Sequence, residues 1–506
     1  MRSQKTLKNI KVDLFITLSI VLLGFISRKI FIDHMGADAT GLMLLFVQLI
    51  GVINIAEMGV GTATASLLYK PLSDNDKPAV SRILESAAKI YKAIATLVFL
   101  VGVVTGIVIY YTIPSVSLIE YSFLFWIIYV SNTAISYLFA HYLILLTADQ
   151  KYYITRTIQG GAKILCILLQ LMVIVIYKNF LFYILCESIF LLIQFVLFRN
   201  KIKKDYGICC SNASQNHTTK DEFDAVKKKI KNVFFHKIGG VLVFNTDYII
   251  ISKFLTLTSV TIYSSYMMIF QALAMIVNIL GNSVTASVGN FLSDKDTARK
   301  KIIWNQIIIV FFYISTCLTL ITLLTITDFV RLWIGSGYTL DNMTLYALLF
   351  NLFVLISRVS IDIIKNASGE FGDIYLPIIE GVVNIVVSIL LVTKIGFIGV
   401  VIGTAISNSL IICLAKPAYL YKRVLKGGII EFLYSILKPL TLSVLSAAVV
   451  ISCSNLWSNT SDFYHWSIKT STVSVFVVCI VSCFFLLSVE FRFVFKKVVL
   501  LLINKK

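Results

Sequence analysis

Charged side chains interrupt several long apolar stretches of this sequence, and these are the residues whose types could do chemistry. An ionisable group at mid-membrane costs about 2.5 to 3.5 kcal/mol on insertion scales, so it usually faces the protein interior, a charged partner or a water-filled path. Such cations could bind an anion, and such carboxylates could bind H+ or Na+ or balance the cations. The candidate cations are Arg28, Lys29, Lys163 and Arg358, and the candidate carboxylates are Glu57, Asp247, Asp362 and Glu380.

Two pairs among these residues have positions that suggest contact. Arg358 and Asp362 lie four residues apart, so they share one helical face, as an ion pair inside a membrane requires. Arg28 and Asp247 occupy matching positions of an internal repeat, so they could face one cavity. Purely structural roles explain the same residues: Arg358 and Asp362 could only stabilise their helix, Arg28 could extend to the membrane surface, and Asp247 could sit in a local polar cluster.

Motifs for enzymatic chemistry are absent from the sequence. It contains no HExxH motif of zinc proteases, no GxSxG motif of serine hydrolases and no phosphate-binding Walker loop. Its 5 histidines are scattered without the spacing of metal ligands. We therefore expect no catalytic residue, no metal site, no bound cofactor and no enzymatic activity.

The elements that position the charges are long apolar segments. Of the 506 residues, 58% are hydrophobic and only 14% are charged, far from the usual composition of a soluble globular protein. A bilayer core of about 30 Å needs about 20 apolar residues per helix. We expect an all-α integral membrane protein with about fourteen spans, near 12–32, 41–68, 90–111, 119–146, 153–176, 180–198, 234–254, 260–290, 302–325, 342–364, 374–393, 396–420, 433–453 and 468–490.

The formal net charge of +19 reflects membrane topology rather than nucleic-acid binding. Most Lys and Arg residues lie in short segments between the apolar spans. Under the positive-inside rule, their alternation places both termini in the cytoplasm, and the basic segment 199–237 is the strongest signal. We expect no nucleic-acid partner.

A repeat divides the chain into halves. LSDND at 72–76 returns as LSDKD at 292–296, and TAS at 64–66 returns at 285–287 with nearly the same separation. Both copies would start from the cytoplasm, as in the parallel repeats of some secondary transporters, although shared hydropathy could also produce such echoes. We expect a six-helix bundle at 1–198, a basic cytoplasmic linker at 199–233, a second six-helix bundle at 234–425, and two further transmembrane helices with a basic cytoplasmic tail at 426–506.

Several motifs together carry a resemblance to a known family. They are GLMLLF at 41–46, EMGVG at 57–61, LYKPL at 68–72, NTD at 245–247, LWIG at 332–335 and KNASG at 365–369. On the strength of these motifs, residues 10–425 resemble the polysaccharide transporter family. This family comprises the Wzx-type oligosaccharide flippases and belongs to the multidrug/oligosaccharidyl-lipid/polysaccharide (MOP) exporter superfamily. One departure is segment 256–260, which lacks the glycine expected after the seventh helix.

The resemblance implies two bundles that enclose a cavity and work by alternating access. The implied cargo is an undecaprenyl-diphosphate-linked oligosaccharide, carried across the bacterial cytoplasmic (inner) membrane for O-antigen, capsule or exopolysaccharide synthesis. The four candidate cations would then contact the diphosphate or acidic sugars, and the four carboxylates would couple to H+ or Na+ or balance charge. A glycan polymerase and glycosyltransferases would be natural partners beside the lipid bilayer.

Other functions fit parts of the pattern. A MATE-like multidrug/cation antiporter of the same superfamily would share the architecture, but it would prefer acidic and aromatic residues in its cavity. A membrane glycan polymerase is disfavoured because the predicted external loops are short. A scaffold of a glycan assembly complex could use the basic 199–237 segment to bind enzymes or anionic lipids.

Overall fold

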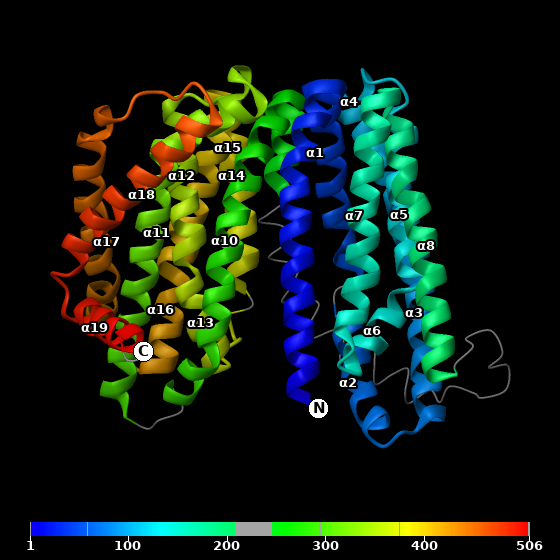
Figure 1. The fold of residues 1–506 in the computed structure, drawn as a ribbon, viewed down its shortest axis with the longest axis horizontal. Coiled ribbons are helices and arrows are strands. Elements are labelled where there is room, and N and C mark those ends of the chain that lie inside the picture. Colours follow the sequence, from blue (N-terminus) through cyan, green and yellow to red (C-terminus); the bar gives the residue numbers. More distant parts are fainter. Residues whose placement is uncertain (1, 58, 208–244, 293–295, 374, 504–506) are drawn as a thin grey trace. The chain divides into compact units, whose positions relative to one another are not determined.

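The computed structural model describes residues 2–57, 59–207, 245–292, 296–373 and 375–503. Every regular element in these ranges is a helix, which confirms the all-α prediction (Figure 1). The chain forms two compact units, Met1–Thr261 (unit 1) and Ile262–Lys506 (unit 2). The helical residues 245–254, which the predicted division places in the second bundle, belong to unit 1.

The protein is a multi-pass membrane protein. Within the described ranges, 11 helices are long and apolar enough to cross a membrane, or 12 if the bent pair Ser122–Tyr137 and Ala140–Ala148 forms one span. This is fewer than the expected number of about fourteen, for two reasons. One continuous stretch, Lys11–Ile53, contains the expected span 12–32 and the start of 41–68. The expected span 234–254 begins outside the described residues.

Unit 1 combines long helices with shorter, broken ones. Figure 1 shows α3 and α5, and also α7 and α8, as neighbours that run along each other. The elements are α1 (Arg2–Ile53), η1 (Asn54–Glu57), α2 (Val60–Ser73), α3 (Lys77–Thr112), α4 (Pro114–Ser117), α5 (Ser122–Tyr137), α6 (Ala140–Ala148), α7 (Tyr152–Tyr177), α8 (Phe180–Tyr206) and the helical residues 245–254.

Helix α1 changes direction at one residue. Gly36 has φ 83° and ψ 172°, a conformation that is costly for any residue with a side chain. The hydroxyl of Thr40 donates to the Gly36 carbonyl at 2.7 Å, which satisfies one polar group at the kink. The expected spans 12–32 and 41–68 are therefore separated by a single-residue kink rather than by a loop.

An aromatic core holds unit 1 together at the kinked end of α1. Phe46 and Trp126 are almost fully buried and meet edge to face with ring centroids 5.1 Å apart. The indole nitrogen of Trp126 donates to the Gly102 carbonyl at 2.7 Å, so α5 approaches α3 at a small residue. Small residues let helices approach closely in membranes, where lipid offers no hydrophobic drive for helix association.

Unit 2 is also helical throughout its described residues. Its elements are α10 (Leu257–Leu292, which starts in unit 1), α11 (Thr297–Ile334), η2 (Ser336–Tyr338), α12 (Asn342–Ser357), α13 (Val359–Ser368), α14 (Tyr375–Ile395), α15 (Phe397–Ser407), the π-helix η3 (Asn408–Ala415), α16 (Lys416–Leu420), the π-helix η4 (Tyr421–Leu425), α17 (Ile429–Ser452), η5 (Ser454–Leu456), α18 (Phe463–Phe485) and α19 (Val489–Ile503).

The last two long helices pack on α11 through polar contacts. The Thr316 hydroxyl lies 2.7 Å from that of Ser443 on α17, and the Tyr313 hydroxyl lies 2.9 Å from that of Ser482 on α18. Trp466 at the start of α18 donates to the Thr325 carbonyl at 3.1 Å. These hydrogen bonds attach the two additional helices at several depths along α11.

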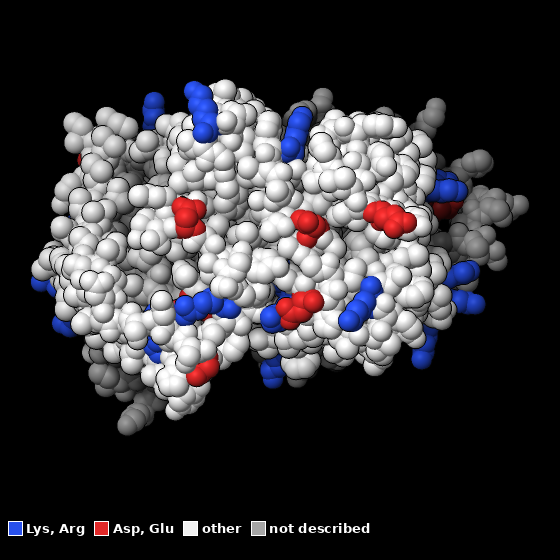
Figure 2. Space-filling model, turned by 90° about the horizontal axis from the view of Figure 1, so that it is seen from above, with Lys and Arg blue, Asp and Glu red and all other residues white. Residues whose placement is uncertain are grey.

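Figure 2 shows a face on which charged residues are scattered among uncharged ones. In Figure 2, which views the top of Figure 1, uncharged residues make up most of the visible surface. One acidic group at a loop end, Asp341, is the N-cap of α12, and hydrogen bonds from Thr344 hold the pKa of its carboxyl below the ordinary value.

The cytoplasmic placement of both termini stays a prediction.

Two adjacent glycines on α7 test the close packing of α1 against α7. A Cβ at Gly160 would lie 2.2 Å from Cγ2 of Ile16 on α1, whereas a Cβ at Gly161 would meet no atom within 4 Å. We expect Gly160→Val to destabilise the purified protein by about 1 to 3 kcal/mol through overpacking. Thermal unfolding in detergent would measure this.

Gly161→Val is the matched control, because it makes the same change one residue away on the same helix. Its midpoint of unfolding should stay near that of the unaltered protein. Equal loss in both variants would mean that helix propensity, and not contact with α1, sets the effect.

Candidate functional site

The densest group of intramembrane charges lies in unit 2. Arg358 stands at the break between α12 and α13, and its Nε is 3.4 Å from Oδ2 of Asp362. The other carboxylate oxygen of Asp362, Oδ1, accepts from Nζ of Lys416 on α16 at 2.5 Å. Glu380 on α14 is close enough to interact electrostatically with all three. We call Arg358, Asp362, Glu380 and Lys416 the charge cluster.

Helix irregularities position two members of the charge cluster. Arg358 interrupts the helical ladder between α12 and α13. Lys416 directly follows the π-helix η3 and precedes Pro417. Proline lacks a backbone N–H and its ring collides with the carbonyl four residues earlier, which disfavours a regular α-helix at this point. Single π-helical turns inside α-helices are frequent at functional sites.

Two members of the charge cluster are buried, whereas the side chains of Arg358 and Asp362 are 23% and 35% exposed. Glu380 is 4% exposed and Lys416 is 7% exposed. Buried charges must be paired, because removing each one from water costs on the order of several kcal/mol. The two carboxylates and two cations of the cluster balance, so each desolvated charge has an opposite charge nearby.

A second ion pair and a polar layer extend the charge cluster. Nζ of Lys365 lies 2.5 Å from Oδ1 of the fully buried Asp373. One helical turn after Glu380, Asn384 donates through Nδ2 to the Thr404 hydroxyl at 2.9 Å. Within the described part of the chain, Oε1 of Glu380 and Oδ1 of Asn384 have no hydrogen-bond partner. Glu380 could receive a proton, and the two oxygens, four residues apart on α14, could accept hydrogen bonds or bind a small cation.

Unit 1 brings together two of the predicted residues. Arg28 interacts electrostatically with the hydroxyls of Tyr183 and Tyr248. Tyr248 in turn interacts with both Arg28 and its neighbour Asp247, which is 3% exposed. Arg28 and Asp247 therefore share a tyrosine partner inside unit 1. The repeat predicted that the two residues could face one cavity, and within unit 1 both interact electrostatically with Tyr248.

The other predicted cations of unit 1 form more exposed ion pairs. Nζ of Lys29 lies 3.0 Å from Asp33 one turn along α1, and both side chains are about two-fifths exposed. Nζ of Lys163 on α7 lies 3.2 Å from Oε1 of Glu187 on α8. Glu57 on η1 accepts from the Tyr91 hydroxyl at 3.0 Å. None of these three contacts joins Lys29, Lys163 or Glu57 to another predicted site residue.

Sequence reasoning missed Lys416 and Glu187. Each of these partners lies on a different helix from the charge that it pairs with, so spacing on one helix could not reveal it. The available signal was each residue's presence in an otherwise apolar segment, the same signal that identified Arg358 and Lys163. Among the described residues, no group of three His, Cys, Asp or Glu side chains could hold a metal ion.

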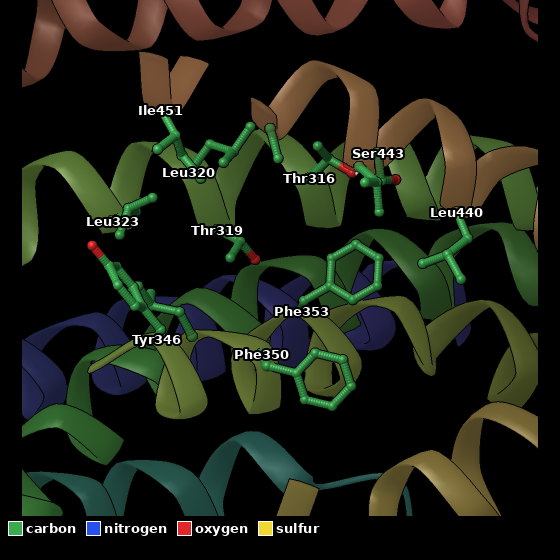
Figure 3. A pocket seen from close by; sticks show the side chains of 13 residues that line it. Thr316, Thr319, Leu320, Leu323, Tyr346, Phe350, Phe353, Leu440, Ser443 and Ile451 are labelled. Carbon is green, nitrogen blue, oxygen red and sulfur yellow. Dashed lines mark hydrogen bonds between the residues drawn. The ribbon is translucent and has the colours of Figure 1, made fainter. Parts of the chain in front are cut away.

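A separate apolar groove of about 380 Å³ lies within unit 2 between α11, α12 and α17. In Figure 3, Tyr346, Phe350 and Phe353 of α12 line one side and Leu320 of α11 lies opposite them. Its lining is almost entirely hydrocarbon, and the hydroxyls of Thr316 and Ser443 bond to each other at its edge. Such a groove fits an alkyl or isoprenoid chain rather than a polar ligand.

Comparison with known proteins relates the chain by fold and not by sequence. No protein-family model matches the sequence, and no curated protein matches it. Among solved structures, the lipid II flippase MurJ in an inward closed conformation is similar, with a TM-score of 0.68 and 16% identity over 94% of this chain and 98% of that chain.

Two structures of multidrug-resistance MATE-family transporters of the MOP superfamily are also similar. The inward-facing one has a TM-score of 0.60 and 15% identity, covering 80% of this chain and 94% of that chain. The outward-facing one has a TM-score of 0.53 and 15% identity, covering 84% and 96%. The chain therefore has the fold of transporters of the MOP superfamily.

Proposed function

We propose that the protein is a flippase that moves undecaprenyl-diphosphate-linked oligosaccharide repeat units across the bacterial cytoplasmic membrane by alternating access. The observation that carries the proposal is the partly buried charge cluster among apolar helices in a chain with the fold of a lipid II flippase. Both termini would lie in the cytoplasm, and a glycan polymerase and glycosyltransferases would be functional partners.

The chemistry of such a cargo matches the polar and apolar features of the structure. A diphosphate cannot enter hydrocarbon unaided, because removing its hydration costs far more than a single hydrogen bond restores. Arg358 and Lys416 in unit 2 and Arg28 in unit 1 offer cations that could replace that hydration. The groove on α11, α12 and α17 offers an apolar surface for the isoprenoid chain.

Pairing of Arg358 and Lys416 with a carboxylate stabilises these two cations when no cargo is bound. Asp362 pairs with Arg358 and Lys416 through its two oxygens, and Glu380 supplies the second negative charge nearby. An arriving diphosphate would compete with Asp362 for both cations, and protonation or cation binding at Glu380 would keep the total charge low. We infer on this basis that H+ or Na+ is coupled to transport.

A multidrug or cation antiporter is the second candidate function. It is supported by the similarity to the MATE-family transporters and by the buried carboxylates Asp247 and Glu380. The pairing of Asp362 with two cations favours an anionic cargo over a cationic one, because a cationic drug would meet a carboxylate already neutralised.

Deletion of the gene tests which function is correct. For a flippase we expect loss of the surface polysaccharide and accumulation of the polyprenyl-linked repeat unit in the cytoplasmic leaflet. Glycan analysis and an assay of leaflet accessibility would measure both. Normal glycan together with raised sensitivity to cationic dyes would instead establish the antiporter.

Substitutions at Lys416 and Asp362 separate substrate binding from stability. We expect Asp362→Asn to lower protein abundance and to cost roughly 1 to 3 kcal/mol of stability, because two cations lose their shared acceptor. Lys416→Met should preserve abundance better but abolish complementation of the deletion strain. The double variant removes one charge of each sign, so abundance should recover while transport does not.

Lys89→Met is the control, since Lys89 is an exposed residue of α3 that pairs with Glu85 one turn earlier on the same helix. It should complement fully. Recovery of polysaccharide export in the double variant would show that Lys416 has only a structural role.

A further inference from the structure

A short basic helix, α19, follows α18 and contributes neither to the charge cluster nor to the apolar groove of unit 2. The expected basic tail is helical over Val489–Ile503. Helix α18 has 23 residues, which gives a length of about 34 Å at about 1.5 Å per residue, close to the thickness of a bilayer core. Helix α19 therefore begins where hydrocarbon gives way to lipid headgroups. Figure 1 shows α19 at the lower left, below α18.

One face of α19 is attached to three longer helices of unit 2. The ring centroid of Phe491 lies 4.7 Å from that of Tyr313 on α11 and 5.7 Å from that of Phe485 on α18. Oε2 of Glu490 accepts a hydrogen bond from Nζ of Lys438 on α17 at 2.6 Å. Glu490 is the single acidic residue of α19, and this ion pair balances its charge.

The opposite face of α19 carries an apolar stripe. At about 3.6 residues per turn, positions 489, 493 and 500 line up along the helix, about half a turn away from Phe491. They are occupied by Val489, Phe493 and Leu500, which are 66%, 60% and 48% exposed. Exposed apolar side chains that form one line on a helix favour contact with another apolar medium over contact with water. At the edge of a bilayer, that medium is the acyl chains of the lipid.

Cations lie on both sides of the apolar stripe. The helical period places Arg492 and Lys496 along one side of it and Lys497 along the other, and all three residues are exposed. The long side chains of Arg and Lys can extend toward phosphate groups while their carbon chains stay in contact with hydrocarbon. An apolar centre with flanking cations is the pattern of a helix that lies in the plane of a membrane surface.

We propose that α19 binds anionic phospholipids, with Arg492, Lys496 and Lys497 contacting the headgroup phosphates and the apolar stripe entering the acyl chains. Charge complementarity selects this ligand, because cations close to an anionic lipid surface each add to the attraction. Zwitterionic lipids offer the same acyl chains without the net negative charge. Through Phe491 and Glu490, bound lipid would hold α11, α17 and α18 at the membrane surface. The inference goes beyond the proposed flippase function and does not depend on its cargo.

Two variants separate the charge of α19 from its apolar stripe. The triple variant Arg492→Gln/Lys496→Gln/Lys497→Gln removes the three cations and keeps the stripe. Phe493→Gln keeps the cations and interrupts the stripe. All four positions are exposed, and Gln is a good helix former, so α19 should fold in both variants.

Hydrogen exchange of the α19 backbone amides, followed by mass spectrometry, is the measurement. The purified full-length protein is placed in nanodiscs of phosphatidylglycerol or of phosphatidylcholine. We expect at least about tenfold slower exchange in phosphatidylglycerol, because bound headgroups oppose local opening of the helix. Salt at about 1 M should remove most of this difference, since it shortens the screening length to about 3 Å. The triple variant should lose the difference, and Phe493→Gln should exchange faster than the unaltered protein in both lipids.

The matched control is Arg199→Gln/Lys203→Gln/Lys204→Gln, which removes one Arg and two Lys from exposed positions near the end of α8 in unit 1. Its α19 amides should keep their dependence on phosphatidylglycerol. Equal exchange of the unaltered protein in the two lipids, or an unchanged difference in the triple variant of α19, would overturn the proposal. Protection found only in native membranes would also overturn it and indicate a protein partner. The nanodiscs contain no lipid-linked oligosaccharide, so failure here leaves the flippase proposal untouched.

Discussion

The cost of placing a charge in hydrocarbon is the constraint on which the rest of this structure depends. Every helix that crosses the membrane must satisfy its own backbone, and every ionisable side chain must find a partner or pay its desolvation. Asp362 therefore serves two cations, Lys163 meets Glu187, and Arg28 lies beside tyrosine hydroxyls. Among the described residues, these three charges meet opposite charges or polar groups from other helices, whereas Lys29 pairs with Asp33 on its own helix.

The same constraint explains why helices break beside the charges. A regular helix uses all its backbone groups and offers none to a ligand. The 3-10 turn that ends at Glu57, the interruption at Arg358 and the π-helix before Lys416 each depart from regular geometry. Such departures are tolerable in a membrane only when the freed groups are buried in protein or line a water-filled cavity. One instance among the described residues is the pocket of about 540 Å³ beside Glu57, which Asn54, Thr62 and Thr147 also line.

Sequence alone predicted the all-helical membrane fold, because apolar segments of span length dominate the composition. It also predicted the contact of Arg358 with Asp362, since four residues make one helical turn. It could not predict Lys416 as the second partner of Asp362, because that contact depends on how separate helices pack. The single-residue kink at Gly36 was equally hidden: hydropathy falls at a kink as it does at a loop, and only backbone geometry distinguishes them.

A balanced charge cluster has consequences for how tightly a carrier can bind. If Arg358 and Lys416 were unpaired, the diphosphate of the proposed cargo would bind strongly and leave slowly, which would limit turnover. With Asp362 already in contact, the anion gains only the difference between its own interaction and the one that it replaces. Binding is then weaker and exchange is faster. A carboxylate that competes with the cargo is therefore an expected component of a site that must release what it binds.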